Sequence, residues 1–239
     1  MTRITTVFDK LRQQNRKALI PFITAGDPDP ALMVPLMHEL VKAGADVIEL
    51  GVPFSDPMAD GPTIQRSSER ALKYGVGLKD VLTMVEEFRK DDVATPVVLM
   101  GYLNPVEIRG AQAYATAVTR AGVDGMLLVD LPPEEADEFR VAFAEHGLAL
   151  VLLAAPTTSD ARMQALCAQA TGYLYYVSYA GVTGADRLDT GAANDRLQAI
   201  RAHSPVPVVA GFGIKDAASA AVAPWTKPRS LVNRSKRPM

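Results

Sequence analysis

The chain alternates short apolar segments with longer helical segments seven times, and this repeat limits the folds open to it. The apolar runs are residues 18–24, 46–50, 96–100, 125–129, 149–153, 173–177 and 206–210. They lack polar alternation, which is typical of strands buried on both faces of a parallel sheet. Segments with helical periodicity follow at 30–43, 62–74, 78–90, 105–121, 133–146, 159–170 and 192–202. The repeat therefore predicts an α/β protein with right-handed crossovers.

Two topologies fit this repeat, a doubly wound open sheet and a closed barrel. No Gly-x-Gly-x-x-Gly motif follows the first apolar run, which disfavours a dinucleotide-binding sheet. Polar residues gather directly after the predicted strands, where a barrel places its active site. Both observations favour the barrel, while the open sheet stays possible. In a (β/α)8 TIM barrel, the catalytic domain would span residues 1–223 and the eighth β/α unit would be missing or altered.

Residues 224–239 differ in composition from the rest of the chain. They hold five cations, three prolines and no acid, and only Leu231-Val232 resembles a strand. This composition argues against a buried eighth strand and predicts a disordered basic tail. Without that strand the first and seventh strands would expose unpaired edges. We therefore expect reduced stability and weak or absent activity.

The overall composition excludes several classes of protein. Hydrophobic residues make up 48% of the chain and charged residues 22%, with a net charge of −2, as in soluble globular proteins. Residues 1–223 carry no basic footprint for nucleic acid, and no apolar run approaches the roughly 20 residues of a membrane helix. No His/Cys cluster indicates a metal site. A single cysteine and the lack of a signal peptide favour the cytoplasm.

An acidic residue lies inside the second apolar run, close to its carboxyl end. Glu49 occupies that position, and Asp60 follows in a loop rich in Pro and Gly. Burying an unpaired carboxylate costs on the order of several kcal/mol. No Arg or Lys lies on a neighbouring apolar run to pair with Glu49, so we interpret this residue as functional. For Asp60 alone, a turn or helix N-cap would be the simpler interpretation.

Glycine pairs follow the last two apolar runs, at Gly181/Gly184 and Gly211/Gly213. Glycine lets backbone N–H groups approach an anion, and the late loops of barrels commonly bind phosphate. Each pair alone could be an ordinary turn, but two pairs together favour a phosphate site.

Several segments resemble those of a known family. Residues 47–65 read VIELGVPFSDPMADGPTIQ, and these residues, with 21–28, 100–105, 130–132, 181–184 and 211–214, are similar to signatures of the tryptophan synthase alpha chain family. The resemblance covers residues 1 to about 223. It implies a TIM-barrel lyase of tryptophan biosynthesis that cleaves indole-3-glycerol phosphate to indole and glyceraldehyde 3-phosphate. It also implies no cofactor in this chain, and a beta-chain partner that uses pyridoxal phosphate in an assembly of two alpha and two beta chains.

The resemblance also implies roles for particular residues. Glu49 would be the catalytic acid/base and Asp60 its partner at the indole nitrogen. Phe22, Met100, Tyr102, Tyr175 and Phe212 would line the substrate pocket, Thr183 would belong to a closing loop, and Gly184 and Gly213 would donate backbone hydrogen bonds to phosphate.

The chain departs from the family pattern in two places. Tyr179 stands where the family usually has Arg, and the eighth strand with its following Gly-Ser pair is absent. Two alternatives to the lyase therefore stay open. One is a member that only docks with the beta chain, and the other is a different phosphate-binding barrel enzyme.

Overall fold

The protein is built on one parallel sheet whose strands follow chain order. The computed structural model describes the backbone of residues 1–177 and 190–211, and the side chains of these residues except 190–196. The seven strands pair in the order β1-β2-β3-β4-β5-β6-β7, and every pairing is parallel. Their bounds are β1 Phe22–Thr24, β2 Ile48–Gly51, β3 Val97–Gly101, β4 Gly125–Leu128, β5 Ala149–Ala154, β6 Leu174–Val177 and β7 Val208–Gly211.

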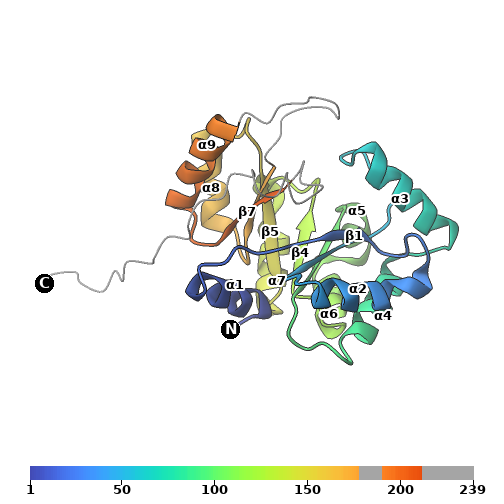
Figure 1. Ribbon diagram of the computed structural model, residues 1–239. Coiled ribbons are helices and arrows are strands. Elements are labelled where there is room, and N and C mark those ends of the chain that lie inside the picture. Colours follow the sequence, from blue (N-terminus) through green and yellow to red (C-terminus); the bar gives the residue numbers. More distant parts are fainter. Residues whose placement is uncertain (178–189, 212–239) are drawn as a thin grey trace, which may run out of the picture.

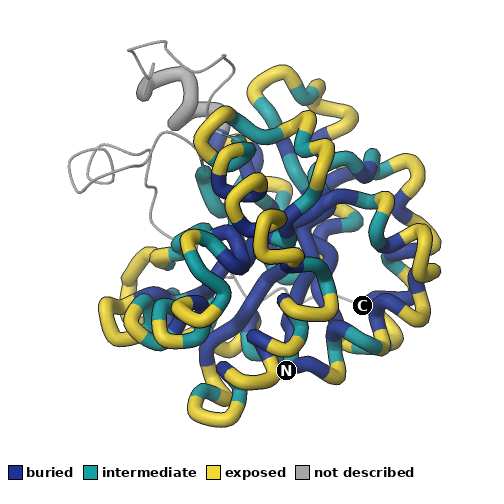
Figure 2. The backbone as a smooth tube through the Cα atoms, turned by 90° about the vertical axis from the view of Figure 1, so that its right-hand side faces the viewer, coloured by how far each residue is buried: buried dark blue, intermediate teal, exposed yellow. Residues whose placement is uncertain are grey.

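Helices surround the curled sheet, and all of those described except α1, which precedes β1, connect successive strands (Figure 1). They are α1 Arg3–Gln13, α2 Met33–Lys42, α3 Pro62–Lys73, α4 Leu78–Phe88, α5 Asn104–Arg109, α6 Ala111–Arg120, α7 Asp137–Glu145, α8 Asp160–Gln169 and α9 Thr190–His203, with short 3-10 turns at Pro30–Leu32 and Pro133–Glu135. The sheet is the buried centre of the molecule, and the loops and outer helix faces are exposed (Figure 2).

All seven strands expected from the apolar runs are confirmed, as is the helix after each of the first six. The expected helix at 105–121 is two helices, because Gly110 adopts a positive φ of 82° between α5 and α6. Helix α1 was not expected. The eighth β/α unit, Tyr179 and the tail at 224–239 lie outside the described residues.

Alternation along the strands divides the apolar side chains into two clusters. The outer cluster packs the sheet against the helices and includes Ile48, Leu50 and Leu99. The inner cluster fills the inside of the curl and includes Val47, Val98 and Tyr173. Because side chains on a strand alternate between faces, Glu49 shares the inner face with Val47.

Helix α1 closes one end of this interior. Its N-cap is Thr2, whose side chain accepts a hydrogen bond from the amide of Thr5. Ile4 is fully buried and belongs to the inner cluster, with Ala149 and Tyr173. Helix α1 thus packs against the inner cluster at one end of the curled sheet and not against the outer face of the sheet. In the described parts of the chain, no helix is long and apolar enough to cross a membrane.

We expect Ile4→Ala to lower the free energy of unfolding by about 2–4 kcal/mol, because truncation leaves a cavity in the inner cluster. Urea unfolding followed by circular dichroism measures the change. Lys10→Ala, on the exposed face of the same helix, should change stability by less than about 0.5 kcal/mol. Equal, small effects of both substitutions would contradict the packing of α1.

Candidate active site

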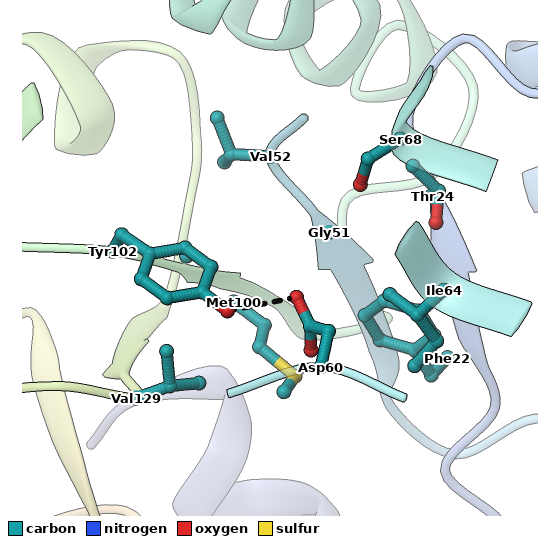
Figure 3. Close-up of a pocket in the computed structure, with 11 residues that line it drawn as sticks. Phe22, Thr24, Gly51, Val52, Asp60, Ile64, Ser68, Met100, Tyr102 and Val129 are labelled. Carbon is teal, nitrogen blue, oxygen red and sulfur yellow. Dashed lines mark hydrogen bonds between the residues drawn. The ribbon is translucent and has the colours of Figure 1, made fainter. Parts of the chain in front are cut away.

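A cavity opens at the carboxyl ends of the first strands, the end at which barrel enzymes carry their active sites. Its empty volume is about 270 Å³, open mouth included. Strands β1 to β3, the loops after β2, β3 and β4, and helix α3 supply the wall (Figure 3). The lining residues are Phe22, Thr24, Gly51, Val52, Asp60, Ile64, Ser68, Met100, Gly101, Tyr102 and Val129.

Glu49 lies on β2 in the interior of the sheet, with 3% of its surface exposed. Its Oε1 accepts a hydrogen bond of 2.6 Å from the hydroxyl of Tyr173, and it has no ion pair with any residue that the structure describes. Glu49 is not itself part of the cavity wall. Gly51 is, two residues further along the same face of β2. The carboxyl group therefore lies one layer beneath the cavity.

Burial raises the pKa of Glu49 to about 7, although the hydrogen bond from Tyr173 works in the opposite direction. Desolvation disfavours the charged form of a carboxyl group, which explains the sign of the shift. At neutral pH the residue is therefore divided between its protonated and ionised forms. A group in this state can both donate and accept a proton, as the sequence analysis expected of apolar surroundings.

Asp60 lies in the loop between β2 and α3 and reaches into the cavity (Figure 3). Its Oδ2 accepts a hydrogen bond of 3.1 Å from the hydroxyl of Tyr102, which in turn accepts one of 3.0 Å from the amide of Ala59. Partial burial raises the pKa of Asp60, and the Tyr102 hydrogen bond opposes this rise. The N-cap of α3 is Gly61, so the alternative of a capping role for Asp60 is not supported.

The pocket residues expected from the sequence fall into two groups. Phe22, Met100 and Tyr102 line the cavity. The ring of Phe22 lies against Gly51, where a Cβ would meet its Cζ atom at 2.7 Å, so the glycine makes room for the ring. Tyr175 lies on β6 and is not part of the cavity wall; burial raises its pKa, and the negative charge of Glu49 adds to this rise. Thr183, Gly184, Phe212 and Gly213 lie outside the described residues.

Some residues of the site were not found from the sequence. Tyr173 was not among the candidate residues, because nothing in the sequence relates it to a glutamate that lies 124 positions away. Thr24, Ile64, Ser68 and Val129 also line the cavity. Thr24 ends β1, and its position at a strand end was the one signal that could have identified it.

Comparison with known proteins identifies the family of this chain. The family model for the tryptophan synthase alpha chain matches residues 8–227. The chain belongs to the tryptophan synthase alpha chain family. The alpha chain of Xanthomonas campestris is 68% identical over 220 residues, which are 92% of this chain and 81% of the relative. The alpha chain of Xanthomonas oryzae is 69% identical over 222 residues, covering 92% and 83%.

Solved structures of tryptophan synthase have the same fold. The alpha subunit of Legionella pneumophila superposes with a TM-score of 0.84 at 51% identity, over 90% of this chain and 79% of that one. A chain of the α2β2 complex of Pyrococcus furiosus, described in terms of mutual activation, gives 0.78 at 40% identity, over 86% and 82%. The TIM barrel and the lyase function expected from the resemblance are confirmed.

The comparisons do not bear out the expectation of weak or absent activity. The physical reason lies in where the site is built. Glu49, Asp60 and their partners Tyr102 and Tyr173 all precede residue 178, and none belongs to the tail at 224–239. Family membership also excludes a different phosphate-binding barrel enzyme, and the docking-only alternative finds no support. No group of three or more His, Cys, Asp or Glu in the described segments could hold a metal ion.

The raised pKa of Glu49 makes stability depend on pH. Its pKa rises from 4.5 to about 7 on folding, so its contribution to stability is complete below 4.5 and is lost as the pH rises through 7. We expect Glu49→Gln to match the wild type near pH 4.5 and to be more stable by about 3 kcal/mol near pH 8. Urea unfolding at both values measures the difference. A pH-independent difference would show that Glu49 is not buried.

Proposed function

We propose that Glu49 and Asp60 carry the proton transfers by which this chain cleaves indole-3-glycerol phosphate to indole and glyceraldehyde 3-phosphate. The observation that carries the proposal is a buried glutamate with a pKa of about 7 beneath a cavity that presents a second carboxylate. The apolar side chains of Phe22, Ile64 and Met100 suit the indole ring. A retro-aldol cleavage of this substrate requires an acid/base of this kind.

The reaction begins with proton transfer to carbon 3 of the indole ring. Protonated Glu49 gives its proton to this carbon, which breaks the aromaticity of the ring and places positive charge on the ring nitrogen. Asp60, as a carboxylate next to that nitrogen, stabilises the charge as it develops. Favourable electrostatics inside a water-poor cavity are stronger than in bulk solvent.

The second step breaks the carbon–carbon bond. The Glu49 carboxylate, having lost its proton, takes one from the hydroxyl on the adjacent glycerol carbon, and that oxygen becomes the aldehyde carbonyl. The electrons of the broken bond return to the ring, which neutralises the nitrogen and restores aromaticity. Because the same group donates one proton and accepts another, a pKa near the working pH serves both steps.

The resting position of Glu49 implies a movement before the first step. Its carboxyl group is bonded to Tyr173 below the cavity, so it must turn from this partner toward the substrate. We assign Thr183 to the closing loop, Gly184 and Gly213 to phosphate binding, and Phe212 and Tyr175 to the substrate pocket. These assignments rest on the family resemblance.

The same proposal includes a partner and a location. We assign this chain a beta-chain partner that carries the pyridoxal phosphate, in an assembly of two chains of each kind. The match to a chain of the Pyrococcus furiosus α2β2 complex supports this. A cytoplasmic location is supported by the lone cysteine, Cys167, which is buried and free. The catalytic domain is assigned to residues 1–223 and the basic tail to 224–239.

Glu49→Gln tests the acid/base role. We expect kcat for indole release to fall at least about 100-fold, because the amide can neither donate the proton nor accept it. KM should change little, since the side chain lies beneath the cavity wall. The assay uses the full chain, alone and with the beta chain. Equal indole release by variant and wild type would disprove the role of Glu49.

Tyr102→Phe tests the environment of Asp60. The lost hydrogen bond lowers the pKa of Asp60 in the wild type, so its removal should raise this pKa. We expect the acid limb of the kcat/KM profile to move to higher pH. Tyr114→Phe is the control, because its hydroxyl contacts Met126 Sδ and not the cavity. An acid limb that stays in place in Tyr102→Phe would show that Asp60 is not the group titrating there.

A further inference from the structure

Two hydroxyl groups of the cavity wall have no hydrogen-bond partner in the part of the chain that the structure describes. Thr24 and Ser68 each have 5% of their surface exposed, and both line the cavity. Neither side chain makes a hydrogen bond with another described residue. In Figure 3 their oxygen atoms point toward the part of the cavity that holds Phe22 and Asp60. Hydroxyl groups that line a cavity can bond to its contents, either a ligand or an ordered water.

An ion pair fixes the elements that carry these hydroxyls. Arg70 on α3 donates two hydrogen bonds to Asp27, of 2.6 and 2.8 Å, and Ser67 adds a third of 2.7 Å. The amide of Asp27 donates in turn to the carbonyl oxygen of Thr24 at 3.2 Å. Helix α3 and the end of β1 are therefore tied together. Thr24 and Ser68 are held in place by the surrounding structure, as in a built binding site.

Most of the other side chains in the cavity wall are apolar, so these two hydroxyls stand out as polar groups. Phe22, Ile64, Met100 and Val129 are apolar. Asp60 is the one ionisable acid of the wall, and its carboxylate is already bonded to Tyr102. A flat aromatic ring in this cavity would meet apolar side chains over most of its surface. The same ring would come within reach of the hydroxyl groups of Thr24 and Ser68, which line the same cavity.

We propose that Thr24 and Ser68 form a hydrogen-bonding subsite that recognises a hydroxyl substituent on the aromatic ring of the ligand. This rests on the proposed function, in which the ring is an indole held at its nitrogen by Asp60. A ring hydroxyl donates to one of the two side chains and accepts from the other. With an unsubstituted ring, an ordered water takes that place. The subsite therefore extends the accepted ligands to hydroxyindoles.

Isothermal titration calorimetry of the full chain with indole and with 4-, 5-, 6- and 7-hydroxyindole tests the proposal. One or more hydroxyindoles should bind the wild type about 3- to 10-fold more tightly than indole, the gain of one hydrogen bond. The double variant Thr24→Val/Ser68→Ala should lose this preference and bind each hydroxyindole no more tightly than it binds indole. Its urea midpoint should not fall, because the hydroxyls it removes have no partner among the residues that the structure describes.

The matched control is Ser67→Ala. Its hydroxyl lies on the same helix but bonds Asp27 instead of lining the cavity, so the preference for hydroxyindole should persist. Two results overturn the subsite, namely no hydroxyindole preference in the wild type, or a preference that survives in the double variant. Neither result affects the cleavage assay with Glu49→Gln. If instead Glu49→Gln released indole as fast as the wild type, while the wild type preferred a hydroxyindole, the proposed function would fail and the subsite would stand.

Discussion

A carboxyl group enclosed by the interior of a parallel sheet is the constraint on which the site depends. Glu49 has no cation to neutralise it among the described residues and retains one hydrogen bond, from Tyr173. Burial alone would raise its pKa still further, and this bond keeps it at about 7. The pair thus sets the protonation state that the proposed chemistry needs. The free energy lost by burying the charge is offset by packing elsewhere in the sheet.

Because side chains alternate along a strand, the residues that stabilise the fold and those that carry the chemistry lie on opposite faces of the sheet. On β2, the side chains of Ile48 and Leu50 point outward into the outer cluster. The side chain of Glu49 points inward, and Gly51 lies on the same inner face. Substitutions on the outer face should therefore act on stability, and those on the inner face on the reaction. The loop after β2 contributes Asp60. Tyr102, in the loop after the neighbouring strand β3, holds Asp60 in place with a hydrogen bond.

Local patterns in the sequence were enough to predict the strands and to identify Glu49, whereas the barrel and the role of Asp60 came from the resemblance to the family. The apolar runs are continuous, and Glu49 is conspicuous in one of them because a buried charge is costly. Contacts between distant segments could not be read in this way. Tyr173 and the hydroxyls of Thr24 and Ser68 acquire their surroundings only when β1, α3 and β6 are brought together. Helix α1 was missed because its buried face is small, with Ile4 and Leu11 as its buried residues.

The position of α1 has a consequence for how the chain is made. Ile4 lies in the inner cluster with Ala149 and Tyr173, and its Cδ1 atom is close to where a Cβ on Gly125 or Gly172 would lie. This helix is synthesised long before the surface that receives it, which is complete only when residue 173 has been added. Helix α1 can therefore dock only after most of the sheet has been synthesised, and until then its apolar face is available to chaperones.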